Sequence, residues 1–208
     1  MSAFMPLFPL NLIAFPGEQL NLHIFEPRYK ELINDCINQK IPFGLPAYIN
    51  NKIEYGTMMH IVEVYKVYED GRVDIKTQGE VVIKIERFEN PTPGKSYAAG
   101  EVIMIENIDD PIPDLRNMTS MIKRLYDKLA IGFDSSSNQM IRTFEIAHKV
   151  GLSLEQEYQL LQIPKESDRA SFIIDHLTHF IPKLAQAEDV KERIRMNGHF
   201  KRLDKLNF

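Results

Sequence analysis

Apolar and polar residues alternate along much of the first half of the chain, a pattern typical of β-strands with one buried face. Leu20, Leu22 and Ile24, for example, alternate with the polar residues Asn21 and His23. Further strands are predicted over residues 42–49, 56–68, 72–78, 80–88 and 97–105. This many short strands, accompanied by one helix, favour a closed or half-closed barrel.

One helix is predicted inside this strand-rich half. Its start is indicated by Pro27, because proline at the first helical position loses no hydrogen bond that the helix would have used. Apolar residues then recur at helical spacing and form a single stripe, which we expect to be buried. The stripe consists of Tyr29, Leu32, Ile33, Cys36 and Ile37.

Two turns are indicated by proline and glycine. Pro16 and Gly17 occupy the central positions of residues 15–18, which suits a type II turn with glycine at positive φ. Asp70 and Gly71 separate two predicted strands, and this dipeptide is typical of a tight hairpin. The strands on either side of Asp70 and Gly71 are therefore expected to pair in an antiparallel arrangement.

The second half of the chain shows helical spacing instead. Helices are predicted over residues 115–129, 140–150, 170–181 and 183–206, and Ser153 with Gln156 fits a capping box. The change of pattern falls in a polar, proline-containing segment, residues 107–114. We therefore expect an α+β fold, with a β-rich domain over residues 1–110 and an α-helical domain over residues 111–208.

Composition and charge narrow the classes of protein. Of the 208 residues, 44% are hydrophobic and 26% are charged, which is ordinary for a globular protein. There is no apolar run of about 20 residues and no signal peptide pattern, and the single cysteine fits a reducing compartment, so a cytoplasmic location is expected. The net charge of −4 counts against nucleic-acid binding, which depends on Lys and Arg.

The opening segment carries an unusual set of motifs. Residues 6–10 read PLFPL, residues 15–17 read FPG, and residues 20–29 read LNLHIFEPRY. This run resembles the start of the Lon protease N-terminal, substrate-binding domain. Gly79 and the later pair Arg87 and Phe88 resemble a further segment of that family. The resemblance implies a PUA-like β pseudo-barrel followed by a helical bundle.

The residues of this family motif are expected to act mainly in turns, caps and packing. Phe25 and Tyr29 are expected to anchor the helix on the barrel, and Glu26 and Arg28 to fix its N-terminus through side-chain hydrogen bonds. The motif residues are Pro9, Phe15, Pro16, Gly17, His23, Phe25, Glu26, Pro27, Arg28 and Tyr29.

Nucleotide and metal sites are weakly supported. Gly94, Lys95 and Ser96 match the end of a P-loop, but Glu89 stands where that loop requires its first glycine. His176 and His179 share a helical face, and residues 145–148 hold one Glu-x-x-His, but neither set is complete for a metal centre. We expect no cofactor and no metal.

Nucleophilic catalysis is also weakly supported. Cys36 lies on the apolar stripe of its helix, as a packing cysteine does. The serines at 135–137 indicate a loop followed by a helix cap. The sequence therefore predicts a protein without catalytic residues.

Four methionines are candidates for contacts with a polypeptide, because methionine adapts to varied apolar partners. They are Met58, Met59, Met118 and Met121, with a groove at the junction of barrel and bundle as the expected surface. The alternative is that they fill gaps in the core. The basic segment 191–205 and the acidic segment 101–114 are either solvated or able to dock a charged partner or a second copy.

The leading hypothesis is a stand-alone member of this family, without the ATPase and protease domains. As the resemblance implies, it binds unfolded or partly unfolded polypeptide and does no chemistry, or acts as an adaptor for a protease or a larger assembly. A monomer or weak homodimer is expected, with no membrane partner. The alternatives are a PUA-like RNA- or nucleotide-binding module, which the acidic first half opposes, and an enzyme of unrecognised type.

Overall fold

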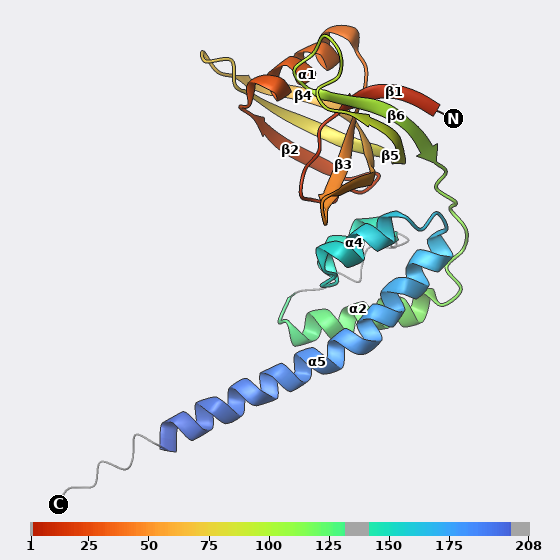
Figure 1. Ribbon diagram of the computed structural model, residues 1–208. Coiled ribbons are helices and arrows are strands. Elements are labelled where there is room, and N and C mark those ends of the chain that lie inside the picture. The colour runs from red at the N-terminus through yellow and green to blue at the C-terminus, as the bar shows by residue number, and fades with distance from the viewer. Residues whose placement is uncertain (1, 132–141, 201–208) are drawn as a thin grey trace, which may run out of the picture. The chain divides into compact units, whose positions relative to one another are not determined.

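A computed structural model describes residues 2–131 and 142–200 of the chain, with side chains as far as residue 186 (Figure 1). The strands are β1 (Ser2–Leu7), β2 (Gln19–Ile24), β3 (Phe43–Ile49), β4 (Lys52–Val67), β5 (Val73–Glu89) and β6 (Ala98–Ile105). The helices are α1 (Pro27–Gln39), α2 (Leu115–Lys128), α3 (Thr143–Ile146), α4 (Leu154–Leu161) and α5 (Glu166–Phe200), with a 3-10 turn at Ala147–Lys149.

The chain divides into two compact units. The first unit holds Met1–Ile112 together with Ile141–Arg169, and the second holds Pro113–Met140 together with Ala170–Phe208. Residues 142–169, from the predicted helical half, are thus grouped with the strands. The mixed α+β composition expected from the sequence is confirmed.

The strands of the first unit form one sheet with the order β2-β5-β4-β3-β1-β6. Strands β5 and β6 also pair, so five of the six strands close on one another and β2 lies outside the ring. The long strands β4 and β5 make this closure possible, because register shifts along their pairing bend them. Strand β5 is continuous where the sequence predicted two strands, and it runs straight through Gly79.

Gly79 is where the opening turn meets the sheet. A Cβ atom at this position would lie 2.4 Å from the carbonyl oxygen of Phe15, so only glycine allows the approach. Gly17 donates a backbone hydrogen bond to Gly79 at 2.9 Å, and Gly79 donates one to Glu18 at 2.9 Å. The predicted turn is confirmed, because Glu18 N–H donates to the Phe15 carbonyl and Gly17 has a φ of +84°.

Helix α1 packs on the strands through four of the five residues of its predicted apolar stripe, and the prediction is wrong for Ile37, which is 39% exposed. Tyr29, Leu32, Ile33 and Cys36 are buried, and all four belong to a core cluster that also contains residues of β2, β3, β4 and β5. The helix ends at Gln39, and its C-cap residue, Lys40, has a φ of 55°. Helix α1 and the strands therefore share one hydrophobic core.

The hairpin between β4 and β5 also forms as predicted. Gly71 has a φ of 77° and donates its N–H to the carbonyl of Tyr68 at 2.9 Å. Tyr68 in turn donates its N–H to Arg72 at 2.9 Å, so three residues form the loop. In Figure 1 this hairpin extends past the other strands on the side where α1 lies.

The helices differ from the sequence predictions at two places. The stripe over 140–150 predicted one helix, but the structure shows the four-residue α3 followed by a 3-10 turn; Met140 and Ile141 lie outside the described residues. The predicted break at Pro182 is wrong, because α5 continues through Pro182 to Phe200 and accepts the loss of one backbone hydrogen bond.

The capping box at α4 is confirmed, with Ser153 and Gln156 bonding each other's backbone N–H. In the second unit, buried stripes on α2 and α5 match the predicted apolar spacing. None of the described helices has the length and apolar character needed to span a membrane.

Candidate functional site

The residues of the opening motif separate into buried anchors and exposed side chains. Phe15 is fully buried and stacks on Phe144 with 5.2 Å between ring centroids, and it also contacts the ring of His148. The turn at residues 15–18 therefore attaches residues 142–150 to the strands within the first unit. Pro9 lines a surface hollow described below.

Phe25 contradicts the sequence prediction. The anchor role is correct for Tyr29, which is buried against Phe8 with 3.9 Å between ring centroids. Phe25 is 59% exposed, because it follows the buried Ile24 at the end of β2 and its side chain takes the opposite direction. It lies beside the ring of His23, with 6.1 Å between centroids.

The predicted capping role of Glu26 and Arg28 is also wrong. Glu26 is the N-cap residue of α1, but its side chain makes no capping hydrogen bond. The Glu26 carboxylate instead pairs with the Arg28 guanidinium at 2.8 Å, and Arg28 lies over the Tyr29 ring at 4.5 Å. Both charged side chains are more than one-third exposed, so this pair contributes little to stability.

A hollow of about 420 Å³ lies beside this ion pair. Its lining mixes motif residues with residues of the strands. The lining residues are Pro9, Leu10, Asn11, Glu26, Arg28, Tyr29, Tyr48, Ile53, Phe88, Asn90 and Ala98. Because its two charged groups already neutralise each other, the hollow has no free charge that selects a ligand.

His23 has a clear structural role. Its Nδ1 lies 2.5 Å from Oδ1 of Asp74, and the Tyr68 hydroxyl donates to the other oxygen of Asp74 at 2.8 Å. These contacts tie β2 to the far part of the β4–β5 hairpin. We call residues 60–76 of this hairpin the hairpin arm.

The hairpin arm carries four exposed large apolar side chains, whereas β1 and β3 carry one each, Phe4 and Tyr48. Val62 is 55% exposed, Val64 39%, Tyr65 51% and Val67 69%. Three of these side chains border hollows beside α1: Val62 and Val64 line one hollow, and Val67 lines another. Ile37 of α1, which is 39% exposed, lies across from this cluster.

Two hollows lie between α1 and the hairpin arm, beside the core contacts that join them. One, of about 320 Å³, is lined by residues of α1 and its C-terminal end, among them Ile37 and Lys40, and by residues 60–64 of the arm. The other, of about 430 Å³, is lined by Lys30, Ile37, Val67 and neighbouring residues. Ile37 borders both hollows, so together they follow the length of α1.

The four methionines do not form an accessible surface. Met59 and Met118 are fully buried, Met58 is 7% exposed and Met121 is 8% exposed. They fill space in the core, because unbranched thioether side chains adapt to irregular gaps. The prediction that these methionines contact a polypeptide is therefore wrong for this conformation.

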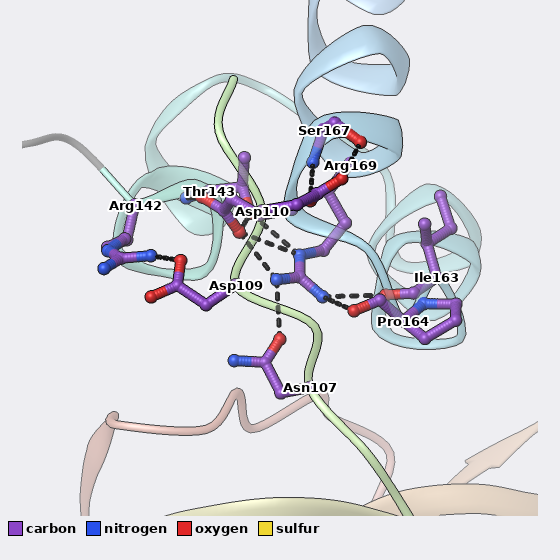
Figure 2. A network of polar contacts seen from close by, with 10 residues as sticks. Asn107, Asp109, Asp110, Arg142, Thr143, Ile163, Pro164, Ser167 and Arg169 are labelled. Atoms are coloured by element: carbon purple, nitrogen blue, oxygen red, sulfur yellow. Dashed lines mark hydrogen bonds and ion pairs between the residues drawn. The ribbon is translucent and has the colours of Figure 1, made fainter. Parts of the chain in front are cut away.

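A buried polar network joins residues 107–110 to α3 and to the start of α5 (Figure 2). Arg169 is 1% exposed, and Glu166 beside it is 3% exposed. Arg169 Nη2 donates to Glu166 at 2.6 Å and to Asn107 at 2.7 Å, and its Nη1 donates to the carbonyls of Ile163 and Pro164. We call this network the polar joint.

The other groups of the polar joint are satisfied as well. Thr143 donates its backbone N–H to Glu166 at 2.8 Å and its hydroxyl at 2.7 Å. Asp110 accepts from the backbone N–H of Ser167 at 2.9 Å and from its hydroxyl at 2.6 Å, which stabilises the start of α5. Asp109 pairs with Arg142 at the surface.

No group of the polar joint is left over to act on a ligand. Among the described residues, every buried side-chain nitrogen and oxygen has a hydrogen-bond partner. Arg169 also lies over the Phe144 ring at 4.0 Å, and Phe144 stacks on Phe15. The joint is therefore a structural element that continues into the opening motif.

An ion pair reinforces the same contact. His148 lies 3.1 Å from Glu18 and 2.8 Å from Glu157. The hydrogen bond with Glu18, helped by Glu157, raises the pKa of His148 to about 9 despite its partial burial. Burial acts to raise the pKa of Glu18, but the hydrogen bonds from His148 and from the Phe15 backbone outweigh it and lower that pKa.

The sequence candidates for chemistry have structural partners. Lys95 pairs with Asp35 at 2.6 Å and Ser96 donates to Glu31, so the apparent P-loop residues hold their loop against α1. Burial raises the pKa of the Cys36 thiol to about 12, which leaves it protonated and unreactive. Lys95 and Cys36 therefore both have structural roles.

The histidine candidates show no metal site. His176 stacks on Phe180 and His179 contacts the carbonyl of Asp175. The part of the chain that the structure describes contains no group of three His, Cys, Asp or Glu residues suited to a metal ion. The serines at 135–137 lie outside the described residues, as do the side chains of the basic segment 191–205.

Sequence reasoning missed the hairpin arm and the polar joint. The arm had a signal, since residues 62–67 alternate less regularly than a half-buried strand and contain two adjacent apolar residues, Val64 and Tyr65. The joint had a weaker one, the spacing of Glu166 and Arg169 by three residues on a helix. Nothing in the sequence indicated that this pair is buried.

Comparison with known proteins identifies the family of the chain and similar folds. Residues 5–179 match the family model described as the ATP-dependent protease La (LON) substrate-binding domain. The fold is similar to that of a Lon N-terminal domain protein from Xanthomonas campestris, with a TM-score of 0.66 and 24% identity, covering 83% of this chain and 98% of that one. Comparison with curated proteins found no match.

A second solved structure is similar, the N-terminal domain of the Mycobacterium avium complex Lon protease. Its TM-score is 0.65 and its identity 15%, covering 86% of this chain and 100% of that one. Both likenesses concern the fold. The family match extends from the opening motif through the polar joint into α5, so the chain belongs to the family of the Lon protease substrate-binding domain.

Proposed function

We propose that this protein binds unfolded or partly unfolded polypeptide through the apolar surface of the hairpin arm. The family is named for substrate binding, and the substrates of a protease are polypeptides. The observation that carries the proposal is the exposure of Val62, Val64 and Val67, which line two hollows along α1, together with the exposed Tyr65 on the same strand.

The exposed side chains are not needed by the protein's own core. The core beneath α1 is complete without them, since Leu32, Phe43, Met59 and Ile75 are fully buried or nearly so. Keeping apolar side chains in water has a cost of about 25 cal/mol per Å², which a bound apolar segment would recover. Unfolded polypeptide offers such segments, whereas folded proteins bury them.

We propose, as the family resemblance implies, that the protein does no chemistry, acts independently of ATP, and works in the cytoplasm as a monomer or weak homodimer. It would either present polypeptide to a protease or serve as an adaptor in a larger assembly. Its net charge of −4 supports a role without nucleic acid. We also propose that the closed strands form a PUA-like pseudo-barrel. The helical bundle domain over residues 111–208 stays a prediction, and its bounds differ from the second compact unit because residues 142–169 group with the strands.

Binding of a permanently unfolded protein tests the proposal. Reduced and carboxymethylated α-lactalbumin, labelled with fluorescein, is titrated with the full chain and followed by anisotropy; native α-lactalbumin is the control ligand. We expect binding of the unfolded form only. Replacing Val64 and Val67 together by glutamate should weaken it about tenfold or more, because two apolar contacts are lost.

Phe4→Glu is the matched control variant, because Phe4 is an apolar side chain on β1 that is 58% exposed. It should leave the affinity unchanged. Equal weakening by Phe4→Glu and by the Val64 and Val67 replacement would show that binding is not located on the hairpin arm. Absence of any binding by the unfolded ligand would contradict the proposed function itself.

A further inference from the structure

We propose that the hairpin arm captures its ligand by strand addition: an extended polypeptide segment pairs with the open edge of β4 over residues 60–67. This inference rests on the proposed function and gives its mechanism. The occupant is a single extended segment with apolar side chains at alternating positions. Backbone hydrogen bonds would hold it, and the two hollows beside α1 would receive its side chains.

The open edge follows from the sheet register. Strand β3 pairs with β4 only as far as the partners Phe43 and Met59, whereas β5 pairs with β4 along the whole arm to Val67. Beyond Met59, no strand among the described residues pairs with the second edge of β4. That edge therefore presents N–H and C=O groups to solvent, and only another extended backbone supplies matching groups in alternation.

The side-chain environment fits an extended ligand. The hollow at residues 60–64 and the hollow at Val67 lie on the side of the arm that faces α1, with Ile37 between them. Alternate side chains of a strand point to the same side and repeat at about 6.6 Å. Two apolar side chains of one segment, two or four positions apart, would occupy the two hollows in turn.

The irregularity of the edge favours a flexible segment over a second copy of this chain. Val62 and Tyr65 are extra residues in β4, because the pairing with β5 shifts at both positions. Such bulges twist an edge and oppose its pairing with another fixed edge. An unfolded segment has no structure of its own to lose and can follow the bulges.

N-methylated peptides separate strand addition from simple apolar contact. The probe is a fluorescein-labelled nine-residue peptide in which valine alternates with threonine or lysine. Two derivatives carry N-methyl groups on every second amide, one set on each edge of the extended peptide. We expect the parent to bind, one derivative to lose about tenfold or more in affinity, and the other to bind within about threefold.

Equal affinity of the parent and both derivatives would overturn strand addition and leave the proposed function in place. Failure of the parent peptide and of unfolded α-lactalbumin to bind would overturn both. Ile37→Glu should weaken the parent peptide about tenfold, with Phe4→Glu as control and circular dichroism as the check on folding. Sedimentation tests whether a second copy of the chain occupies this edge. Self-association that Ile37→Glu abolishes, and that the parent peptide does not compete with, would also overturn strand addition.

Discussion

The polar joint and the hairpin arm belong to the same compact unit and use opposite kinds of chemistry. In the joint, a buried arginine and glutamate have all their hydrogen bonds made within the protein. In the arm, apolar side chains and one strand edge remain open to solvent. A polar network whose hydrogen bonds are all made cannot bind a ligand without breaking some of them. An exposed apolar strand edge, in contrast, gains free energy when a ligand covers it. We therefore expect the polar joint to stabilise the fold and the hairpin arm to bind the ligand.

Breaking the joint gives the largest expected effect. Arg169→Met leaves the Glu166 carboxylate buried without its charged partner, and we expect the free energy of unfolding to fall by about 3–5 kcal/mol. Urea denaturation followed by far-ultraviolet circular dichroism measures this. Arg87→Met is the control, because Arg87 pairs with Glu89 and Glu101 at the surface, and it should cost under about 1 kcal/mol. Similar losses in the two variants would show that the joint is not sealed from solvent.

The two phenylalanines of the opening motif divide in the same way. Phe15→Ala removes a fully buried ring and should lower the free energy of unfolding by about 3–5 kcal/mol. Phe25→Ala removes a ring that is 59% exposed and should change it by less than about 0.5 kcal/mol. The same urea experiment compares them. A loss from Phe25→Ala as large as that from Phe15→Ala would contradict the separation into anchors and exposed side chains.

The pH dependence of stability gives the smallest expected effect. The folded pKa of His148, about 9, lies above its ordinary value of 6.5, so its charged form stabilises the folded protein. That contribution is complete below pH 6.5 and disappears as the pH rises through 9. Because the side chain is 38% exposed and solvent screens the pair, we expect a loss of roughly 1 kcal/mol.

Urea titrations at a series of pH values across that interval measure the loss. The variant His148→Gln should show a flatter profile, because it has no proton to release in this range. An unchanged profile in His148→Gln would mean that the decline arises from other groups.

The sequence predicted the turns and helix starts of the first unit correctly, because local rules govern them. Gly17 and Gly71 indicate turns because glycine adopts the positive φ that these turns require, and Pro27 indicates the start of α1. The capping box at Ser153 was correct for the same reason. In each case, the residue type and the backbone conformation are linked within four positions of the chain.

Sequence reasoning failed where the outcome depends on distant residues. Phe25 and Phe15 are the same residue type in one motif, and only the fold decides that one is exposed and the other buried. Methionine is a residue type found both in adaptable binding surfaces and in cores, and here the packing around the methionines places them in the core. The open edge of β4 depends on where β3 ends, which the alternation within β4 does not encode.

Hydrogen–deuterium exchange tests the central claim most directly. Exchange is recorded for the full chain alone and with reduced, carboxymethylated α-lactalbumin in excess. We expect slower exchange over residues 60–67 and in the C-terminal half of α1, with no change at β1 or at the polar joint. Protection at β1 or at the joint, with residues 60–67 unaffected while the ligand is bound, would contradict that claim.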